Sequence, residues 1–117
     1  MNESIDIRRK ATHGRVVVLD VEGRLDAKGA AVLRERGSEV AAEGCNLILN
    51  LSGVTFIGSS GLGALLALSE EFQEQAGEVR IAAPSEAARM VFQFISLQRI
   101  LEIDIDEKSS LEALNAA

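Results

Sequence analysis

The chain has 117 residues, of which 47% are hydrophobic and 26% charged, and its net charge is −6. This length suits one domain, and the scarcity of aromatic residues (four Phe, no Tyr, no Trp) predicts an aliphatic core. The negative charge argues against nucleic-acid binding, and no stretch offers the ~20 apolar residues that a membrane span needs. The amino end lacks the apolar segment of a signal peptide, so a cytoplasmic location is expected.

Two strands are predicted at the amino end, one carrying Ile5 and Ile7 and one over residues 15–23, with a turn at 11–14. A helix is predicted over 27–42, with Asp26 as its cap and Gly44 as its stop. Its core-facing residues would be Ala30, Leu33, Gly37, Val40 and Ala41.

The continuous apolar run 46–51 predicts a strand that is covered on both faces. The only cysteine, Cys45, precedes it; an inert core thiol is the favoured interpretation, and a reactive thiol is the alternative. A lone cysteine supplies neither a disulfide nor a paired-thiol metal site, and no metal or cofactor is expected.

The second half alternates helices and strands. A second helix ends at Gly77, and its predicted apolar stripe is Leu62, Leu65, Leu66, Ser69, Phe72 and Ala76. A strand over 78–83, a helix over 85–97 opened by Pro84, and a short strand over 100–105 follow. Ser109 and Glu112 have capping-box spacing for a terminal helix that carries Leu111 and Leu114.

These elements predict one α/β domain over residues 1–117, in the order β-β-α-β-α-β-α-β-α. Because the later strands alternate with helices, the sheet is expected to be mixed and mostly parallel, with helices packed on it. The acidic segment 102–108 is expected to be a solvated edge.

The third helix offers two interpretations of its apolar residues. Its predicted core face holds Ala87, Met90, Val91, Phe94 and Leu97. Phe92 lies about 140° from Ala87 on the helical wheel. Cover by Leu111 and Leu114 is the favoured explanation for Phe92, and an exposed interaction patch is the alternative.

The segment GSSGLG, residues 58–63, lies where a strand gives way to a helix, a usual place for sites in α/β proteins. It has neither the Gly-Lys-Ser/Thr ending of a P-loop, nor dinucleotide glycine spacing, nor the order of a hydrolase elbow. The only histidine, His13, lies in the first predicted turn, so a serine hydrolase is disfavoured and no catalysis is expected. From chemistry alone, a serine that caps the helix is the simplest interpretation.

The stretch LILNLSGVTFIGSSGLGALLAL resembles the signature of STAS domains, a family named for sulphate transporters and anti-sigma factor antagonists. VEGRLDAKGA and IAAPSEAARMVFQFISLQRILEI resemble two further family segments, so the resemblance spans nearly the whole chain. It implies an anti-sigma factor antagonist in which a partner kinase, itself an anti-sigma factor, phosphorylates Ser59. Ser60 is the second candidate acceptor, and a serine phosphatase is the implied partner that resets the switch.

The resemblance also implies a partner-binding surface that includes Asp26, Gly58, Ser59, Ser60, Gly61 and Leu62. Leu62 is expected to be mainly core, and a partner's close approach is favoured over packing for Gly61. Gly58 and Asn50 stand where the family has aspartate. The glycine at position 58 affects recognition by the kinase. A non-phosphorylated interaction module, in a signalling complex or with a membrane transporter, is therefore the alternative function; self-association is left open.

Overall fold

The computed structural model describes residues 4–115, and its elements follow the predicted order. The strands are β1 (Asp6–His13), β2 (Val16–Leu25), β3 (Asn46–Ile57), β4 (Val79–Ala82) and β5 (Glu102–Asp104). The helices are α1 (Ala27–Ala42), α2 (Ser59–Glu74), α3 (Glu86–Phe94), a short 3-10 turn (Leu97–Arg99) and α4 (Glu107–Asn115).

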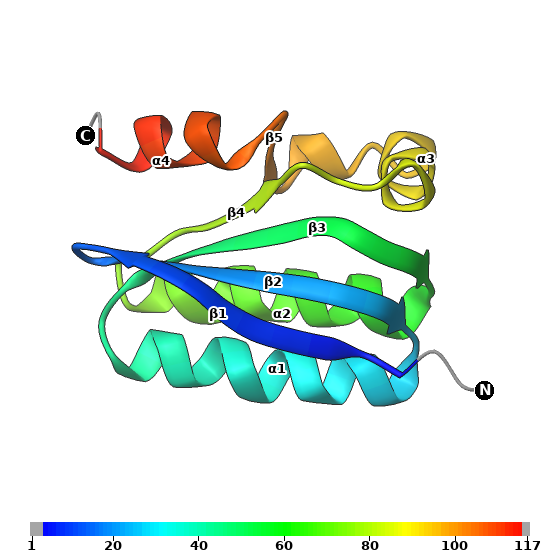
Figure 1. Cartoon of the computed structure of the whole chain (residues 1–117), viewed down its shortest axis with the longest axis horizontal. Coiled ribbons are helices and arrows are strands. Elements are labelled where there is room, and N and C mark those ends of the chain that lie inside the picture. Colours follow the sequence, from blue (N-terminus) through cyan, green and yellow to red (C-terminus); the bar gives the residue numbers. More distant parts are fainter. Residues whose placement is uncertain (1–3, 116–117) are drawn as a thin grey trace.

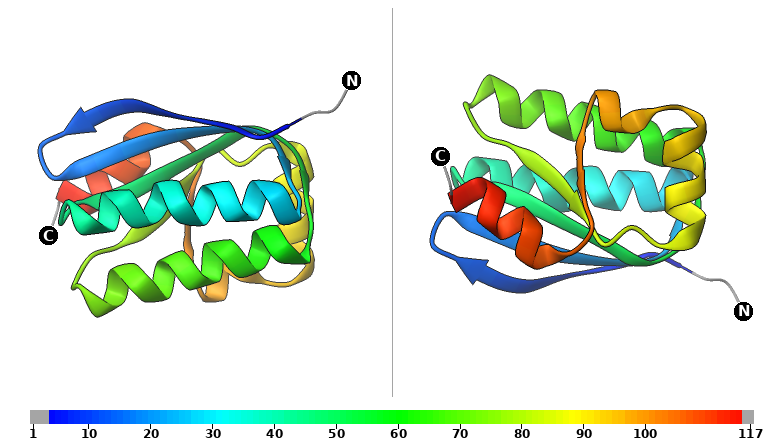
Figure 2. Two further views of the ribbon diagram at one scale, coloured as in Figure 1. Left: turned by 90° about the horizontal axis from the view of Figure 1, so that it is seen from below. Right: turned by 90° about the horizontal axis from the view of Figure 1, so that it is seen from above.

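The five strands form one sheet in the order β1-β2-β3-β4-β5. Only β1 is antiparallel to its neighbour, and the other neighbouring pairs are parallel. Helices α1 and α2 lie side by side on one face, and α3 and α4 cover the other (Figures 1 and 2). The predicted mixed, mostly parallel α/β sheet is therefore confirmed.

Successive side chains of β2 point to opposite faces of the sheet, so its valine-rich run contributes side chains to two hydrophobic clusters. Val17 and Leu19 join the main cluster, which packs against α1 and α2. Val16 and Val18 join a smaller cluster with Ile48 and Ala82, against which Leu111 and Leu114 of α4 pack. This two-sided burial explains why β2 and β3 are apolar without alternation.

Several predicted boundaries are corrected. Strand β1 continues to His13, so the first turn is tighter than predicted and contains Gly14 at φ +63°. Strand β3 continues six residues beyond Leu51 because it keeps pairing with β2 as far as Ile57. Helix α2 ends at Glu74, and Ala76, not Gly77, takes the left-handed conformation at φ +59°. Cys45 is half-buried beside the main cluster rather than within it.

The predicted core face of α3 is right only in part. Leu97 is buried and Val91 packs against the main cluster, but Met90 and Phe94 are 65% and 90% exposed. Ala88 and Phe92 are buried instead, at 0% and 2% exposure. Phe92 belongs to the main cluster and not to the one that Leu111 and Leu114 cover. Apolar residues surround much of this short helix, and it lies across the end of the sheet, nearly perpendicular to α1 and α2 (Figures 1 and 2).

The expected solvated edge near the carboxyl end is confirmed only in part: Glu102, Asp106 and Lys108 are exposed, whereas Asp104 and Glu107 are partly buried. Asp104 accepts hydrogen bonds from Arg80 at 2.8 Å and from Ser110 at 2.6 Å. These contacts, the one with Arg80 foremost, hold the pKa of Asp104 below its usual value. Asp106, rather than Ser109, caps α4, because its Oδ1 accepts the backbone N–H of Ser109 at 2.8 Å.

Asn50 is buried and lies next to Glu107 of α4. Its side-chain amide donates to Glu107 Oε2, and its Oδ1 accepts the backbone N–H of Ser52 at 2.9 Å. Burial tends to raise the pKa of Glu107, but hydrogen bonds from Lys10 and Asn50 outweigh it and lower the pKa. A neutral donor at position 50 therefore matches an ionised carboxylate on α4.

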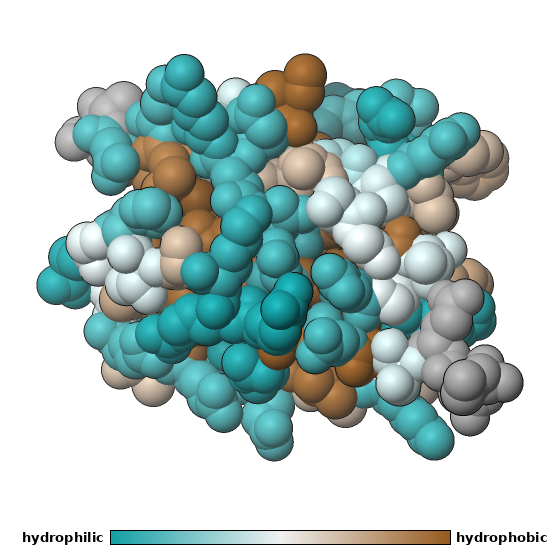
Figure 3. Space-filling view, in the orientation of Figure 1, coloured by the Kyte–Doolittle hydropathy of each residue, from teal (hydrophilic) through white to brown (hydrophobic). Residues whose placement is uncertain are grey.

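The surface along β1 is mostly hydrophilic, with apolar side chains in small separate areas (Figure 3). Charged residues such as Arg8, Arg9 and Lys10 protect this edge strand against pairing with another chain. Within residues 4–115, no helix combines the length and apolar character needed to cross a bilayer. No three His, Cys, Asp or Glu residues in the same range are grouped to hold a metal ion.

We predict that Asn50→Asp destabilises the fold at pH 7 by about 1–3 kcal/mol, because it places a second carboxylate against Glu107 and removes the amide donor, which leaves Lys10 as the donor to Glu107 Oε2. Urea unfolding measures this loss. The double variant N50D/E107Q should recover most of it, since a glutamine amide can donate to Asp at position 50. Equal stability of N50D and the wild type at pH 7 would contradict this account.

Candidate functional site

The carboxyl ends of β2 and β3 lie in register, Leu25 beside Ile57. Gly58, the residue after β3, continues the pairing, because its backbone N–H donates to the C=O of Leu25 at 3.1 Å. Each strand then enters a helix within two residues. The amino ends of α1 and α2 consequently lie side by side at one edge of the sheet, which brings Asp26 and the GSSGLG segment together.

The two helix starts differ in their caps. Asp26 caps α1 as predicted, with its Oδ1 accepting the backbone N–H of Gly29 at 2.9 Å. Gly58 occupies the capping position of α2 in extended geometry, and no side-chain oxygen caps that helix. The first turn of α2 contains no acidic residue. Its amino end therefore keeps N–H groups and a partial positive charge to offer an anion.

Ser59 and Ser60 form the first turn of α2, and both are exposed. Within residues 4–115, neither hydroxyl has a hydrogen-bond partner, so the predicted capping role of a serine is not realised; Gly58 is the capping residue. Leu62 is half-buried against the main cluster, less buried than predicted. The two hydroxyls thus face solvent, while the helix behind them is anchored in the core.

Packing accounts for the glycine at position 61. A Cβ there would lie 2.6 Å from Leu25 O and 3.1 Å from Ile57 Cγ1, so α2 can approach the strand ends only with hydrogen at this position. Gly63 is exposed, and a Cβ there would meet open space. The partner's approach is thus not needed to explain Gly61, and its place in a binding surface stays a prediction.

Two residues that the sequence analysis did not select connect the predicted site residues. The guanidinium of Arg24 lies over the ring of Phe56, with Cζ 4.2 Å from the ring centroid. Arg24 Nε also lies 3.8 Å from Asp26 Oδ2. Their adjacency follows from register, because Arg24 pairs with Phe56 across β2 and β3. The sequence analysis could have selected these two residues only if the register of β2 and β3 had been known, since each residue alone is an ordinary strand residue.

A serine–histidine pair is excluded by topology. His13 lies at the amino end of β2, while Ser59 follows the carboxyl end of β3. The 10 residues of β2 separate these two ends by about 30 Å at the usual rise per residue. Ser59 therefore has no imidazole base.

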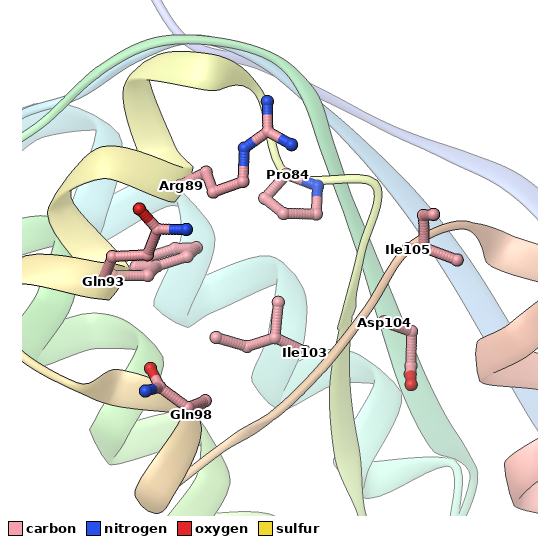
Figure 4. A pocket seen from close by; sticks show the side chains of 8 residues that line it. Pro84, Arg89, Gln93, Gln98, Ile103, Asp104 and Ile105 are labelled. Atoms are coloured by element: carbon pink, nitrogen blue, oxygen red, sulfur yellow. The ribbon is translucent and has the colours of Figure 1, made fainter.

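A cavity of about 400 Å³ lies between α3 and β5, and Pro84, Ile103 and Ile105 line it (Figure 4). Its lining contains no serine, cysteine or histidine, and its one carboxylate, Asp104, is bound by Arg80 and Ser110. The cavity offers no nucleophile with a base, so the exposed serine turn remains the candidate site.

The structure is a small α/β domain with an exposed polar turn at the carboxyl edge of its sheet, where proteins of this class bind their ligands. Residues 8–110 match the STAS domain, and the chain belongs to this family. The anti-sigma F factor antagonist of Lysinibacillus sphaericus is 35% identical over 83 residues, covering 69% of this chain and 71% of that protein.

Solved structures resemble the whole chain. An anti-sigma factor antagonist from Mycobacterium paratuberculosis superposes with a TM-score of 0.85 and 27% identity, covering 96% of this chain and 95% of that one. SpoIIAA in its unphosphorylated form superposes with a TM-score of 0.78 and 25% identity, covering 96% of this chain and 98% of that one. Bacillus SpoIIAA in its phosphorylated form superposes with a TM-score of 0.70 and 26% identity, covering 93% of this chain and 99% of that one.

We predict opposite effects of alanine at the two glycines of α2. Gly61→Ala should destabilise the protein by about 1–3 kcal/mol, because the new methyl group clashes with Leu25 O. Gly63→Ala, the matched control, should stabilise by about 0.5–1 kcal/mol through helix propensity alone. Thermal and urea unfolding measure both changes. A neutral or stabilising Gly61→Ala would refute the packing explanation.

Proposed function

We propose that this domain is an anti-sigma factor antagonist whose binding to an anti-sigma serine kinase is controlled by phosphorylation of Ser59. The observation that carries the proposal is the exposed Ser59 hydroxyl at the uncapped amino end of α2, next to the amino end of α1. The names of the relatives support the antagonist role. The two forms of SpoIIAA support control by phosphate in a protein of the same fold.

A phosphate at Ser59 would be compatible with the folded state. It adds about −1.5 to −2 charges. The first turn of α2 has no acidic residue and no capping side chain, so the added charge meets the positive end of the helix dipole. That arrangement is worth about 0.3–1 kcal/mol in favour of the anion. Phosphorylation should therefore leave the stability of the domain nearly unchanged.

The same phosphate would oppose binding. The proposed partner surface consists of Asp26, Gly58, Ser59, Ser60, Gly61 and Leu62, so Ser59 lies at its centre. A bulky, strongly hydrated dianion there must lose water when a partner covers it, and it repels any acidic group that the partner presents. The unmodified protein is thus the binding form, and a serine phosphatase restores it.

The Ser59→Asp variant should bind the anti-sigma kinase at least about tenfold more weakly than the wild type, a loss of roughly 1.4 kcal/mol or more. Its melting temperature should change by no more than about 2 °C, because the charge is added at a tolerant helix start. Titration calorimetry and thermal unfolding measure the two quantities. Ser59→Ala should bind as the wild type does.

Incubation with the kinase and ATP, followed by intact-mass measurement, tests the modification itself. The wild type and Ser60→Ala should gain one phosphate, and Ser59→Ala should gain none. Binding without any phosphate transfer would favour the alternative, an interaction module without the switch. Gly58 in place of the family aspartate is the observation that keeps this alternative in view.

A further inference from the structure

We infer that Phe56 and Arg24 anchor the partner at this site, and that the partner presents an apolar pocket for the ring with a carboxylate beside it. The inference rests on the proposed function and adds the chemistry of the partner's surface. Phe56 is 37% exposed and lies close to the exposed serine turn, with Arg24 over its ring. Aromatic side chains, Phe included, and arginine are enriched at protein interfaces, and arginine is among the residues that most often dominate binding energy.

The Phe56 ring is held in place by its neighbours. A Cβ on Gly58 would lie 3.2 Å from ring atoms Cε2 and Cζ, so the ring rests close to the backbone of Gly58. Arg24 covers the ring, with its Cζ 4.2 Å from the centroid. A side chain at position 58 would require the ring to shift by a few tenths of an ångström. Glycine lets the ring rest where it lies, against the backbone.

Arg24 is oriented from two sides. Its guanidinium lies between the Phe56 ring and Asp26, whose other oxygen caps α1. A hollow of about 580 Å³ is lined by Arg24, Asp26, Lys28 and Val32, among other residues. The surface thus combines a partly exposed aromatic ring with a hollow that shares Arg24 with it, and a partner of complementary shape would present a pocket to the ring and a protruding group to the hollow.

The charge of this surface selects an acidic group on the partner. Arg24 and Lys28 contribute two positive charges and Asp26 one negative charge, whereas the whole chain has a net charge of −6. The aspartate that the family pattern places at position 58 would cancel the remaining charge, and glycine leaves it. A carboxylate facing Arg24 would also be repelled by a phosphate on Ser59, which connects partner selection with the proposed switch.

Binding to purified anti-sigma serine kinases of the encoding bacterium, each titrated separately by calorimetry, tests the inference. Phe56→Ala should weaken binding at least tenfold and Arg24→Gln at least fivefold. Arg24→Gln should also reduce the dependence of affinity on salt. Two exposed residues outside the surface provide matched controls: Ile105→Ala and Arg99→Gln should change affinity less than twofold.

Three substitutions at position 58 separate shape from charge. Gly58→Asn crowds the ring without adding charge, and Gly58→Asp both crowds the ring and adds a negative charge, so Gly58→Asp should reduce affinity at least threefold more than Gly58→Asn. In the Phe56→Ala background, Gly58→Asn should reduce affinity less than twofold, because there is no ring to crowd. The coupling between positions 56 and 58 is also measured without a partner, by thermal unfolding of Gly58→Ala in the wild-type and Phe56→Ala backgrounds.

The outcomes are distinct. If the wild type binds a kinase and is phosphorylated on Ser59, but Phe56→Ala and Arg24→Gln bind equally well, the inference is wrong and the proposed function stands. If Gly58→Asp binds more tightly than Gly58→Asn, the partner is basic at this point and the inference is wrong. If the wild type binds none of the kinases, the proposed function fails and the inference falls with it.

Discussion

The hydrogen bond from the backbone N–H of Gly58 to Leu25 C=O is the constraint on which the site depends. It extends the pairing of β2 and β3 to their last residues, so both strands end at the same level. Two helices then begin side by side, one capped by Asp26 and one left uncapped at Gly58. Gly61 allows α2 to pack directly on these strand ends. A shift of one residue in this register would separate Asp26, Arg24, Phe56 and Ser59 and remove the common surface.

Stability and recognition occupy different parts of the molecule. The main cluster is formed by the sheet, the buried faces of α1 and α2 and the buried residues of α3, and it includes Leu33, Leu65 and Leu68, each with no exposed surface. Ser59 and Ser60 lie at the amino end of α2, outside this cluster, and their hydroxyls make no hydrogen bond within residues 4–115 that the fold would lose. A change of charge at that end therefore acts on what docks there and only weakly on folding, which is the physical requirement for a reversible binding switch.

Sequence reasoning succeeded where a local signal is also the structural cause. Helix α1 has the predicted bounds because Asp26 caps it and its apolar spacing is regular. It failed where tertiary contacts decide. Strand β3 runs past Leu51 because β2 continues beside it, and α3 turns Phe92 rather than Phe94 inward because of its position across the sheet. The serine turn was found from its residues, whereas Arg24 and Phe56 become neighbours only through the register of two strands.

The two departures from the family pattern have local explanations of the same kind. An aspartate at position 50 would oppose the ionised Glu107, and an aspartate at position 58 would crowd the Phe56 ring. The second case is not explained by stability, because glycine gives up a side-chain cap on α2 that an aspartate could supply. The ring stays 37% exposed, so the fold gains from it only part of the burial that a core position would give. A glycine that sacrifices a cap to keep an aromatic side chain at the surface makes sense when that side chain serves contacts beyond the domain.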